Sequence, residues 1–378
     1  MDVDVAIAGA GPAGSAAALY LASQGRSVAV FDKQYFPRDK PCGEGLMPSG
    51  VGVLRELGLL PGLLSGGAPW IRGVAFSAPR TGEAASEFPR GLGLGVRRTV
   101  MDGLFAELLE AHAHVRFHDG CAVTDIHFQP LELVTAQSGV RARCIIVADG
   151  LRSPLRKALG WQRRYTKPYR YGLVGHLRTR GRPEPWIHVA VLDGCEIFSA
   201  PSGPSDQLVA VLGSRAILQG ADLEACYRRV VGADVELSAA LMATGPFNLF
   251  PTKVAGDGVF LLGDAAGFLD PVTGQGLELA LLSARGLAGI LGCMLDGDID
   301  PRRAGLQYAA QHRRLWRERH GLTRLMLWFM ASSGRTRRAV RSLERNQQLL
   351  ASLLGINCGY WGFGRLRPAD WLALLTGR

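Results

Sequence analysis

Cysteine is sparse in this chain, and its spacing limits what the protein can be. Seven cysteines occur in 378 residues, and no two of them form a C-x-x-C pair or another paired spacing. They are Cys42, Cys121, Cys144, Cys195, Cys226, Cys293 and Cys358. This scatter argues against a disulfide framework and against a zinc or other metal site, so we expect a protein of the reducing cytoplasm.

The chain also lacks a long apolar run that is free of charge. Its first residues enter a predicted strand directly, without the basic and apolar regions of a signal peptide. The most apolar helical stretch, residues 276–295, carries Glu278 and Arg285. We therefore predict that this helix is buried inside the protein and does not span a membrane.

Acidic residues are nearly absent from one region near the C-terminus. Between Pro301 and Arg345 twelve arginines stand against only Glu318 and Glu344, an excess that matches the net charge of +10 of the whole chain. One interpretation is a basic amphipathic helix, with Arg313, Arg314 and Arg317, that lies on the inner face of an anionic membrane. The other is a helix that covers the core with its arginines in solvent. Nothing resembles a nucleic-acid reading module, so we expect no nucleic acid partner.

The first 32 residues contain the strongest local signal. An almost uncharged strand is followed by Gly9, Gly11 and Gly14 in a G-x-G-x-x-G turn, and then by a predicted helix. A second strand ends at Asp32, eighteen residues after Gly14. The glycines allow a tight turn and close approach to a pyrophosphate, and the acid is placed to bind a ribose. These features predict dinucleotide binding, without choosing between FAD and NAD(P).

The remaining pattern predicts an α/β protein with two domains. Its length and ordinary globular composition, 47% hydrophobic and 20% charged, allow a doubly wound domain and a second domain of comparable size. Alternating strands between about residues 165 and 252 predict an antiparallel sheet. Short strands around residues 70–88 are assigned to the same domain. Residues 301–378 are predicted to be mostly helical.

Two later motifs also stand at predicted strand ends. Asp149-Gly150 follows one buried strand, and Gly263-Asp264 follows another. Pro271 and the turn Gly274-Gln275-Gly276 then open a helix, whose N-terminus favours an anion such as the edge of a reduced flavin. Acids at the carboxyl ends of parallel strands point into the ligand crevice of such a sheet.

The three motifs in this order resemble the flavoprotein superfamily of para-hydroxybenzoate hydroxylase and the geranylgeranyl reductases, over roughly residues 1–300. The resemblance implies FAD in a GR2-type Rossmann-like domain made of residues 1–69, 97–160 and 253–300. An inserted antiparallel β-sheet substrate domain would comprise residues 70–96 and 161–252, and residues 301–378 would form a C-terminal helical region.

The same resemblance implies individual roles. Asp32 would hold the adenosine ribose, Asp149 would lie near the pyrophosphate, Asp264 would hold the ribityl chain, and the turn 274–276 would face the flavin edge. Arg98 would approach the cofactor, and the backbone of Val123 would contact adenine. The full set of expected cofactor contacts is Gly9, Gly11, Pro12, Ala13, Gly14, Asp32, Lys33, Cys42, Gly43, Arg98, Val123, Asp149, Gly263, Asp264, Pro271, Gly274, Gln275 and Gly276.

The segment Lys40-Pro41-Cys42-Gly43-Glu44-Gly45-Leu46 resembles the K-P-C-G-x-G-L segment of the geranylgeranyl reductase branch, where it lies along the isoalloxazine. Cys42, Gly43, Glu44 and Gly45 are therefore the flavin-facing candidates. Cys42 is either catalytic or, as we favour, a small residue that fills space beside the flavin. No metal ligand set and no general base can be named, although His176 and His188 alternate into the sheet and could face a substrate.

A departure from the reductase pattern guides the functional prediction. The prenyl reductases carry a Y-x-W-x-F-P-type motif in the sheet, whereas residues 195–201 read Cys-Glu-Ile-Phe-Ser-Ala-Pro, without tryptophan. The halogenase W-x-W-x-I-P pattern is absent too. The leading hypothesis is a monooxygenase that uses NADPH or NADH and O₂ to hydroxylate a hydrophobic aromatic or polyketide-like substrate. The alternatives are a reductase of an isoprenoid C=C bond and, far behind, a non-catalytic nucleotide-binding module.

Overall fold

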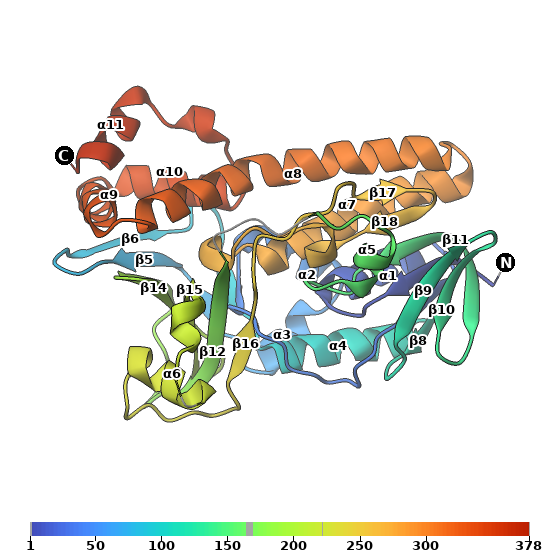
Figure 1. Ribbon diagram of the computed structural model, residues 1–378, viewed down its shortest axis with the longest axis horizontal. Helices are drawn as coiled ribbons and strands as arrows, with labels where there is room; N and C mark the ends of the chain where they lie inside the picture. The colour runs from blue at the N-terminus through green and yellow to red at the C-terminus, as the bar shows by residue number, and fades with distance from the viewer. Residues whose placement is uncertain (1, 164–168, 221, 378) are drawn as a thin grey trace.

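The computed structural model of the chain describes residues 2–163, 169–220 and 222–377. Residues 1, 164–168, 221 and 378, which fall within the three predicted regions, lie outside the described part. Two β-sheets lie at opposite ends of an elongated molecule, and long helices run along one side of both (Figure 1). The protein has an α/β fold with mixed sheets, as the sequence predicts.

The N-terminal glycine motif belongs to an eight-stranded sheet whose main path runs β17-β18-β11-β1-β2-β8. The strands on this path are β1 (Val3–Ala8), β2 (Val28–Phe31), β8 (Val115–His118), β11 (Gly139–Val147), β17 (Ala255–Gly256) and β18 (Val259–Leu261). All of these pairs are parallel except β17 with β18. The carboxyl ends of five parallel strands therefore meet at one edge, which is where a ligand crevice forms in such sheets.

Successive side chains of β1 point to opposite faces of this sheet, and both faces are buried. Val5 and Ile7 pack with the helices α1 (Pro12–Ser23), α4 (Arg98–Ala111) and α7 (Gly276–Asp296). Ala6 and Ala8 pack on the other face, beneath β9 (Val123–Phe128) and β10 (Leu131–Thr135). Burial on both faces explains why the strand reads as a nearly continuous apolar run.

By length and composition alone, helix α7 could cross a membrane. However, about two thirds of its most apolar 18-residue stretch is buried inside the molecule. The sequence prediction of a buried helix from residue 276 is confirmed. Its N-terminal end lies beside α2 (Pro48–Glu56), because a Cβ added at Gly50 would lie 3.5 Å from Glu278 Cα.

The second sheet has seven strands in the order β16-β12-β15-β14-β13-β5-β6. Their bounds are β5 (Gly73–Ser77), β6 (Glu83–Glu87), β12 (Arg170–Arg178), β13 (Trp186–Leu192), β14 (Cys195–Pro201), β15 (Asp206–Ser214) and β16 (Met242–Thr244). The neighbouring pairs are antiparallel except β13 with β5. Helix α6 (Leu223–Val231) covers one face. A small third sheet, β3-β7-β4 (Gly45–Leu46, Gly93–Gly95, Trp70–Ile71), links the flavin-facing candidates to this region.

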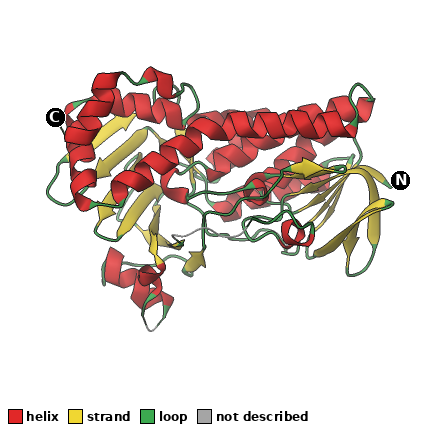
Figure 2. Cartoon of the chain, turned by 45° about the horizontal axis from the view of Figure 1, so that its top comes forward, coloured by secondary structure: helices red, strands yellow, loops and turns green. Residues whose placement is uncertain are grey.

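Four α-helices follow residue 300 in the part of the chain that the structure describes, where the sequence predicts a mostly helical region. They are α8 (Pro301–Met330), α9 (Ser333–Arg345), α10 (Gln347–Asn357) and α11 (Pro368–Thr376), and they form a layer that reaches over both sheets (Figure 2). Trp316 and Phe329 of α8 are buried, whereas Arg313, Arg314 and Arg317 are exposed. This arrangement is the one expected of a helix that covers the core, and association with a membrane stays a prediction.

Two further elements complete the first domain. Leu60–Ser65 form the short helix α3, whose Leu60 and Leu63 are buried. Strand β11 begins at Gly139, and its first residues pair with β10 and not with the central sheet. Helix α5 (Pro154–Ala158) follows it.

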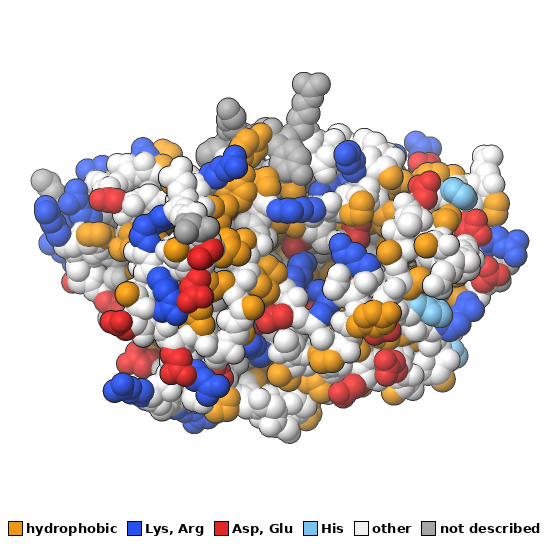
Figure 3. All heavy atoms as spheres, turned by 60° about the horizontal axis from the view of Figure 1, so that its bottom comes forward, with side chains coloured by type: hydrophobic (Ala, Val, Ile, Leu, Met, Phe, Trp, Pro, Cys, Tyr) orange, Lys and Arg blue, Asp and Glu red, His pale blue; other side chains and the backbone are white. Residues whose placement is uncertain are grey.

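Positive and negative side chains are interspersed on the face drawn in Figure 3.

The close packing of α1 on β1 makes a testable prediction. An added Cβ at Gly14 would lie 1.9 Å from the carbonyl oxygen of Gly9, whereas an added Cβ at Gly52 in α2 would meet no atom within 4 Å. Gly14→Ala should lower the free energy of unfolding by about 1–3 kcal/mol. Gly52→Ala should raise it by about 0.5–1 kcal/mol, because alanine favours a helix interior. Denaturant unfolding of both variants checks this, and equal effects of the two substitutions would contradict it.

Candidate cofactor and substrate site

One deep cavity extends along the ends of the parallel strands, beneath the seven-stranded sheet and up to the C-terminal helices. Its wall contains residues from the glycine turn, the loop 40–45, the start of α4 and the connection from β18 to α7. The expected cofactor residues in the wall are Gly11, Pro12, Ala13, Cys42, Gly43, Arg98, Gly263, Asp264, Pro271, Gly274 and Gly276. The fold thus brings together four segments that are far apart in the sequence.

The other expected cofactor residues lie outside this wall. They are Gly9, Gly14, Asp32, Lys33, Val123, Asp149 and Gln275. Lys33 is exposed, and Val123 is half-buried at the start of β9. The backbone of Asp32 receives a hydrogen bond from Cys121 N–H at 2.7 Å, so the chain just before Val123 lies next to Asp32.

The Asp32 carboxylate is bound to the glycine turn. Its Oδ2 accepts a hydrogen bond from Ala10 N–H at 2.9 Å, and its Oδ1 accepts one from Gln34 N–H at 2.9 Å. Arg38 Nη2 lies 3.4 Å from Oδ2. Gly9 has a φ of +104°, and an added Cβ there would meet the carbonyl of Ala148 at 2.3 Å. The acid therefore fixes the shape of the turn whose next helix, α1, begins at Pro12.

Asp149 stands at the end of β11 and has an unused oxygen. Its Oδ2 accepts a hydrogen bond from Leu155 N–H at 3.3 Å, whereas its buried Oδ1 has no partner among the described residues. Burial raises the pKa of Asp149, partly offset by its hydrogen bonds. A buried oxygen without a partner is costly, so a ligand or water that donates to it would stabilise this loop.

Arg156, in the short helix α5, joins two of the acid-bearing strand ends. It is fully buried, and its Nη1 donates to the carbonyl of Ala265 at 2.9 Å. Its Nη2 donates to the carbonyl of Leu151 at 2.8 Å. These contacts tie the loop after Asp149 to the loop after Asp264 and hold both at the same edge of the sheet.

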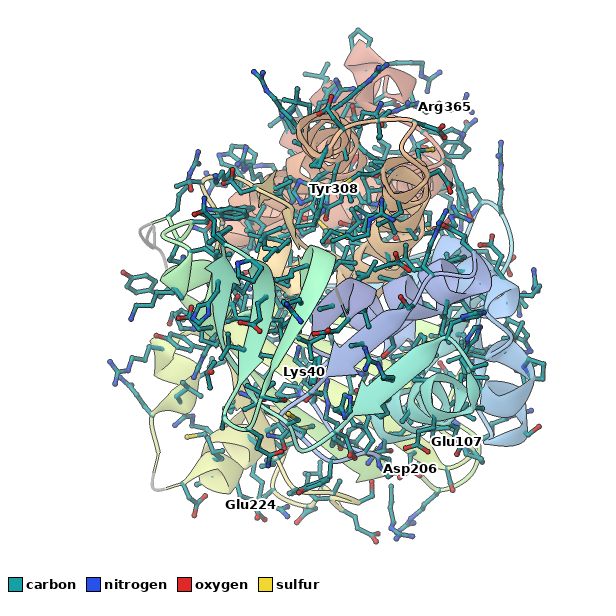
Figure 4. All side chains as sticks on the ribbon, turned by 90° about the vertical axis from the view of Figure 1, so that its right-hand side faces the viewer. Lys40, Glu107, Asp206, Glu224, Tyr308 and Arg365 are labelled. Carbon is teal, nitrogen blue, oxygen red and sulfur yellow. The ribbon has the colours of Figure 1, made fainter. Side chains whose placement is uncertain are left out.

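Asp264 faces a cation from the loop that follows β2. Lys40 Nζ lies 3.9 Å from Asp264 Oδ2, and both side chains are partly exposed. Lys40 lies near the middle of the molecule in Figure 4, below the layer of C-terminal helices that carries Tyr308. The buried hydroxyl of Tyr308 in α8 donates to the carbonyl of Leu261 in β18 at 2.6 Å, which fixes the strand just before Asp264.

Glu44 is the flavin-facing candidate with the most constrained surroundings. Its backbone has a φ of +52°, which is unusual for a residue with a side chain, and the side chain is buried. Its Oε1 accepts a hydrogen bond from Arg98 N–H at 2.8 Å, and its Oε2 pairs with Nε2 of His176 at 3.0 Å. The carboxylate thus joins the cavity loop to α4 and to strand β12 of the overlying sheet.

Cys42 and Arg98 are placed close together, and both line the cavity. Burial raises the pKa of the Cys42 thiol, which disfavours the reactive thiolate. This agrees with a residue that fills space beside a ring better than with a nucleophile. The Arg98 guanidinium is bound in a fork by Asp102, with distances of 2.9 and 2.8 Å, so its side chain has a fixed direction.

The turn before α7 is held from two sides. Asp270 Oδ1 accepts a hydrogen bond from Val272 N–H at 3.0 Å, and its Oδ2 accepts one from Arg170 Nε at 2.8 Å. Arg170 belongs to β12 and also pairs with Glu196 of β14. Gly274 adopts a left-handed φ of +65°. The side chain of Gln275 is not part of the cavity wall and donates to Asn357 in α10.

Beyond these polar residues the cavity is lined by apolar side chains. The sheet contributes Val189, Phe198 and Leu212, and the C-terminal helices contribute Leu322, Phe329 and Leu354, among others. Residues 195–201, where the sequence lacks the tryptophan of the prenyl reductases, form β14, and Phe198 and Ala200 of that strand face the cavity. This part of the site suits a long hydrophobic ligand.

Sequence reasoning missed the contacts that join distant segments. His176 was one of two histidines that could face a substrate, but its pairing with Glu44 has no local signal. His188 is instead half-exposed, near Glu83 and Glu184. No group of three or more His, Cys, Asp or Glu that could hold a metal occurs among the residues that the structure describes.

The pair of Glu44 and His176 predicts a large effect on stability. His176→Leu should lower the free energy of unfolding by about 3 kcal/mol or more, because it leaves the buried Glu44 carboxylate without this partner. His188→Leu, the control on the neighbouring part of the sheet, should change it by less than about 1 kcal/mol, because its ion pairs are exposed. Urea unfolding measures both values, and similar losses in the two variants would refute the assignment.

Glu278 predicts a pH dependence. This fully buried carboxyl in α7 accepts hydrogen bonds from Ser49 and from Arg319, and burial raises its pKa from 4.5 to about 7. The folded protein therefore binds this proton more tightly than the unfolded chain does. The stability from this group is present below pH 4.5 and is lost as the pH rises to about 7, on the order of 3 kcal/mol in total. Glu278→Gln should remove this slope, so parallel pH profiles of the wild type and the variant would contradict the prediction.

Comparisons with known proteins agree with this geometry. The family model described as "FAD binding domain" matches residues 2–203. The menaquinone reductase of Mycobacterium tuberculosis is 33% identical over 325 residues, which cover 76% of this chain and 76% of that protein. The kynurenine 3-monooxygenase of Salinispora arenicola is 28% identical, covering 73% of this chain and 69% of that protein.

Among solved structures, the flavin-dependent brominase Bmp2 superimposes with a TM-score of 0.82 at 19% identity, covering 98% of this chain and 97% of that one. A likeness at this identity shows the fold alone. The match of the FAD-binding model to more than half of the chain, together with the 33% identical relative, shows the family. The chain belongs to the FAD-dependent oxidoreductase superfamily that includes the geranylgeranyl reductases and the flavoprotein monooxygenases.

Proposed function

We propose that this protein is a monooxygenase that uses FAD and NADPH or NADH to hydroxylate an aromatic ring borne by a long hydrophobic substrate. The observation that carries the proposal is one continuous cavity, which extends from the expected flavin residues, beneath the sheet, to the apolar faces of α8, α9 and α10. Such a cavity can hold a ring beside the cofactor and an aliphatic tail among the helices.

The residues present fit an FAD molecule. Added Cβ atoms at Gly9 and Gly14 would strike backbone, so these glycines permit the turn, whereas Gly43 faces open space beside the cavity. The unpartnered Oδ1 of Asp149 is a ready acceptor for a cofactor hydroxyl or bound water. Asp32 would hold the adenosine ribose, Asp264 the ribityl chain, and the turn 274–276 the flavin edge.

When bound and reduced by a nicotinamide, FAD supplies the activation of O₂, with one oxygen atom going to the ring and the other to water. The chain itself orients the ring and excludes water, through Phe198, Val189 and Leu212 of the sheet. Glu44 and His176 form a buried pair beside the cavity that can exchange a proton with a phenolic substrate. The absence of tryptophan from residues 195–201 supports hydroxylation over prenyl reduction.

The second candidate is the reduction of a C=C bond in an isoprenoid chain. It is favoured by the likeness to menaquinone reductases and by the aliphatic lining that the C-terminal helices give to the cavity. Both candidates use the same cofactor site and the same apolar channel. They differ in whether O₂ is consumed and in which part of the substrate changes.

The test supplies purified flavin-loaded protein with NADPH or NADH and either a long-chain alkylphenol or an isoprenoid quinone. Hydroxylation predicts O₂ consumption and a product 16 Da heavier that retains its double bonds. Reduction predicts a product 2 Da heavier that also forms without air. Anaerobic saturation of the isoprenoid chain, with no oxygenated product in air, would overturn the hydroxylase proposal in favour of the second candidate.

A further inference from the structure

The C-terminal helices do more than cover the cavity, because α10 reaches the turn that begins α7. Gln275 Nε2 donates to the side-chain Oδ1 of Asn357 at 2.7 Å and to its backbone carbonyl at 2.8 Å. Asn357 Nδ2 donates in return to the carbonyl of Thr273 at 3.1 Å. All three residues are buried. One amide side chain on α10 therefore binds both a main-chain oxygen and a side chain of the turn.

Helix α8 extends the same network. The hydroxyl of Thr273 donates to Gln275 Oε1 at 3.2 Å and lies 3.0 Å from the hydroxyl of Thr323. Thr323 in turn donates to the carbonyl of Arg319 at 2.9 Å. Both polar atoms of the Gln275 side chain and both of the Asn357 side chain thus have partners. A buried network that is fully satisfied holds one geometry, whereas a partly satisfied one is costly.

This network surrounds the backbone that would face an anion. Gln275 is the residue before the first helical position of α7, and Gly274 is left-handed. Gly274, Gly276 and Asn357 all line the cavity. The first N–H groups of a helix have no partner within the helix, and they attract negative charge. Their direction depends on the turn, which Gln275 and Asn357 hold.

We propose that Asn357 is a positioning residue for the edge of the flavin. From α10 it fixes the carbonyl of Thr273 and the side chain of Gln275, and it thereby aims the first N–H groups of α7 at the flavin edge that becomes negative on reduction. The inference rests on FAD binding in the proposed function. Helix α10 would then contribute to the cofactor site, although it lies outside residues 2–203, which the FAD-binding family model matches.

The test compares Asn357→Leu with Ser352→Ala, at a half-buried position on the same helix, where the Ser352 hydroxyl donates to the carbonyl of Gln348. FAD affinity is measured by fluorescence titration of the deflavinated proteins, the midpoint potential with a reference dye, and folding by circular dichroism. Asn357→Leu should weaken the binding of oxidised FAD about tenfold and that of reduced FAD more, which appears as a lower potential. Ser352→Ala should match the wild type.

A second variant keeps the proposal testable if Asn357→Leu does not fold. Gln275→Leu removes the other half of the same contact and should weaken FAD binding similarly, and the double variant should lose little more than either single one. Folded Asn357→Leu or Gln275→Leu protein with the FAD affinity and potential of the wild type would overturn the inference. A wild-type protein that binds no FAD would overturn the proposed function as well, which separates the two failures.

Discussion

The close approach of helix α1 to the end of strand β1 is the contact on which the rest of the structure depends. It exists because Gly14 lets the helix lie against the carbonyl of Gly9, where any side chain would collide. The Asp32 carboxylate completes the turn through Ala10 N–H. With the turn between β1 and α1 in place, the parallel register of β1 with β2 and β11 brings the loops after Phe31 and Val147 to one edge of the sheet. The crevice of the FAD-binding domain is the consequence.

The place of the motifs in the fold could be predicted from the sequence because their signals are local. A glycine turn, an acid at a fixed distance and two strand-end motifs each lie within a few dozen residues, and the parallel strands bring them to one edge of the sheet. Their contacts with FAD stay predictions. The contacts that couple distant segments could not be predicted. Glu44 meets His176 across 132 positions, and Gln275 meets Asn357 across 82. Side chains such as these carry no periodicity or motif, since only the packed sheet and helices bring them together.

These unpredicted contacts share one physical role. Arg156 joins two strand-end loops, Glu44 joins the cavity loop to the overlying sheet, and Arg170 joins that sheet to the turn before α7. Arg156 and Glu44 are buried and Arg170 is partly buried, so each would be costly to leave without its partner. The apolar cavity is therefore enclosed by parts that are held together by polar contacts at its margin. These polar contacts hold the loops and the turn around the expected flavin position. The apolar side chains of the cavity wall would then limit which substrate fits.

We infer that the glycine turn, the loop 40–45, the strand ends and the turn before α7 form one site for one FAD. Calorimetric titration of the deflavinated protein with FAD tests this for the wild type and for Asp32→Ala and Asp264→Ala. We expect one FAD per chain in the wild type and weaker binding at that same site in both variants. No binding, or unchanged affinity in either folded variant, would contradict it.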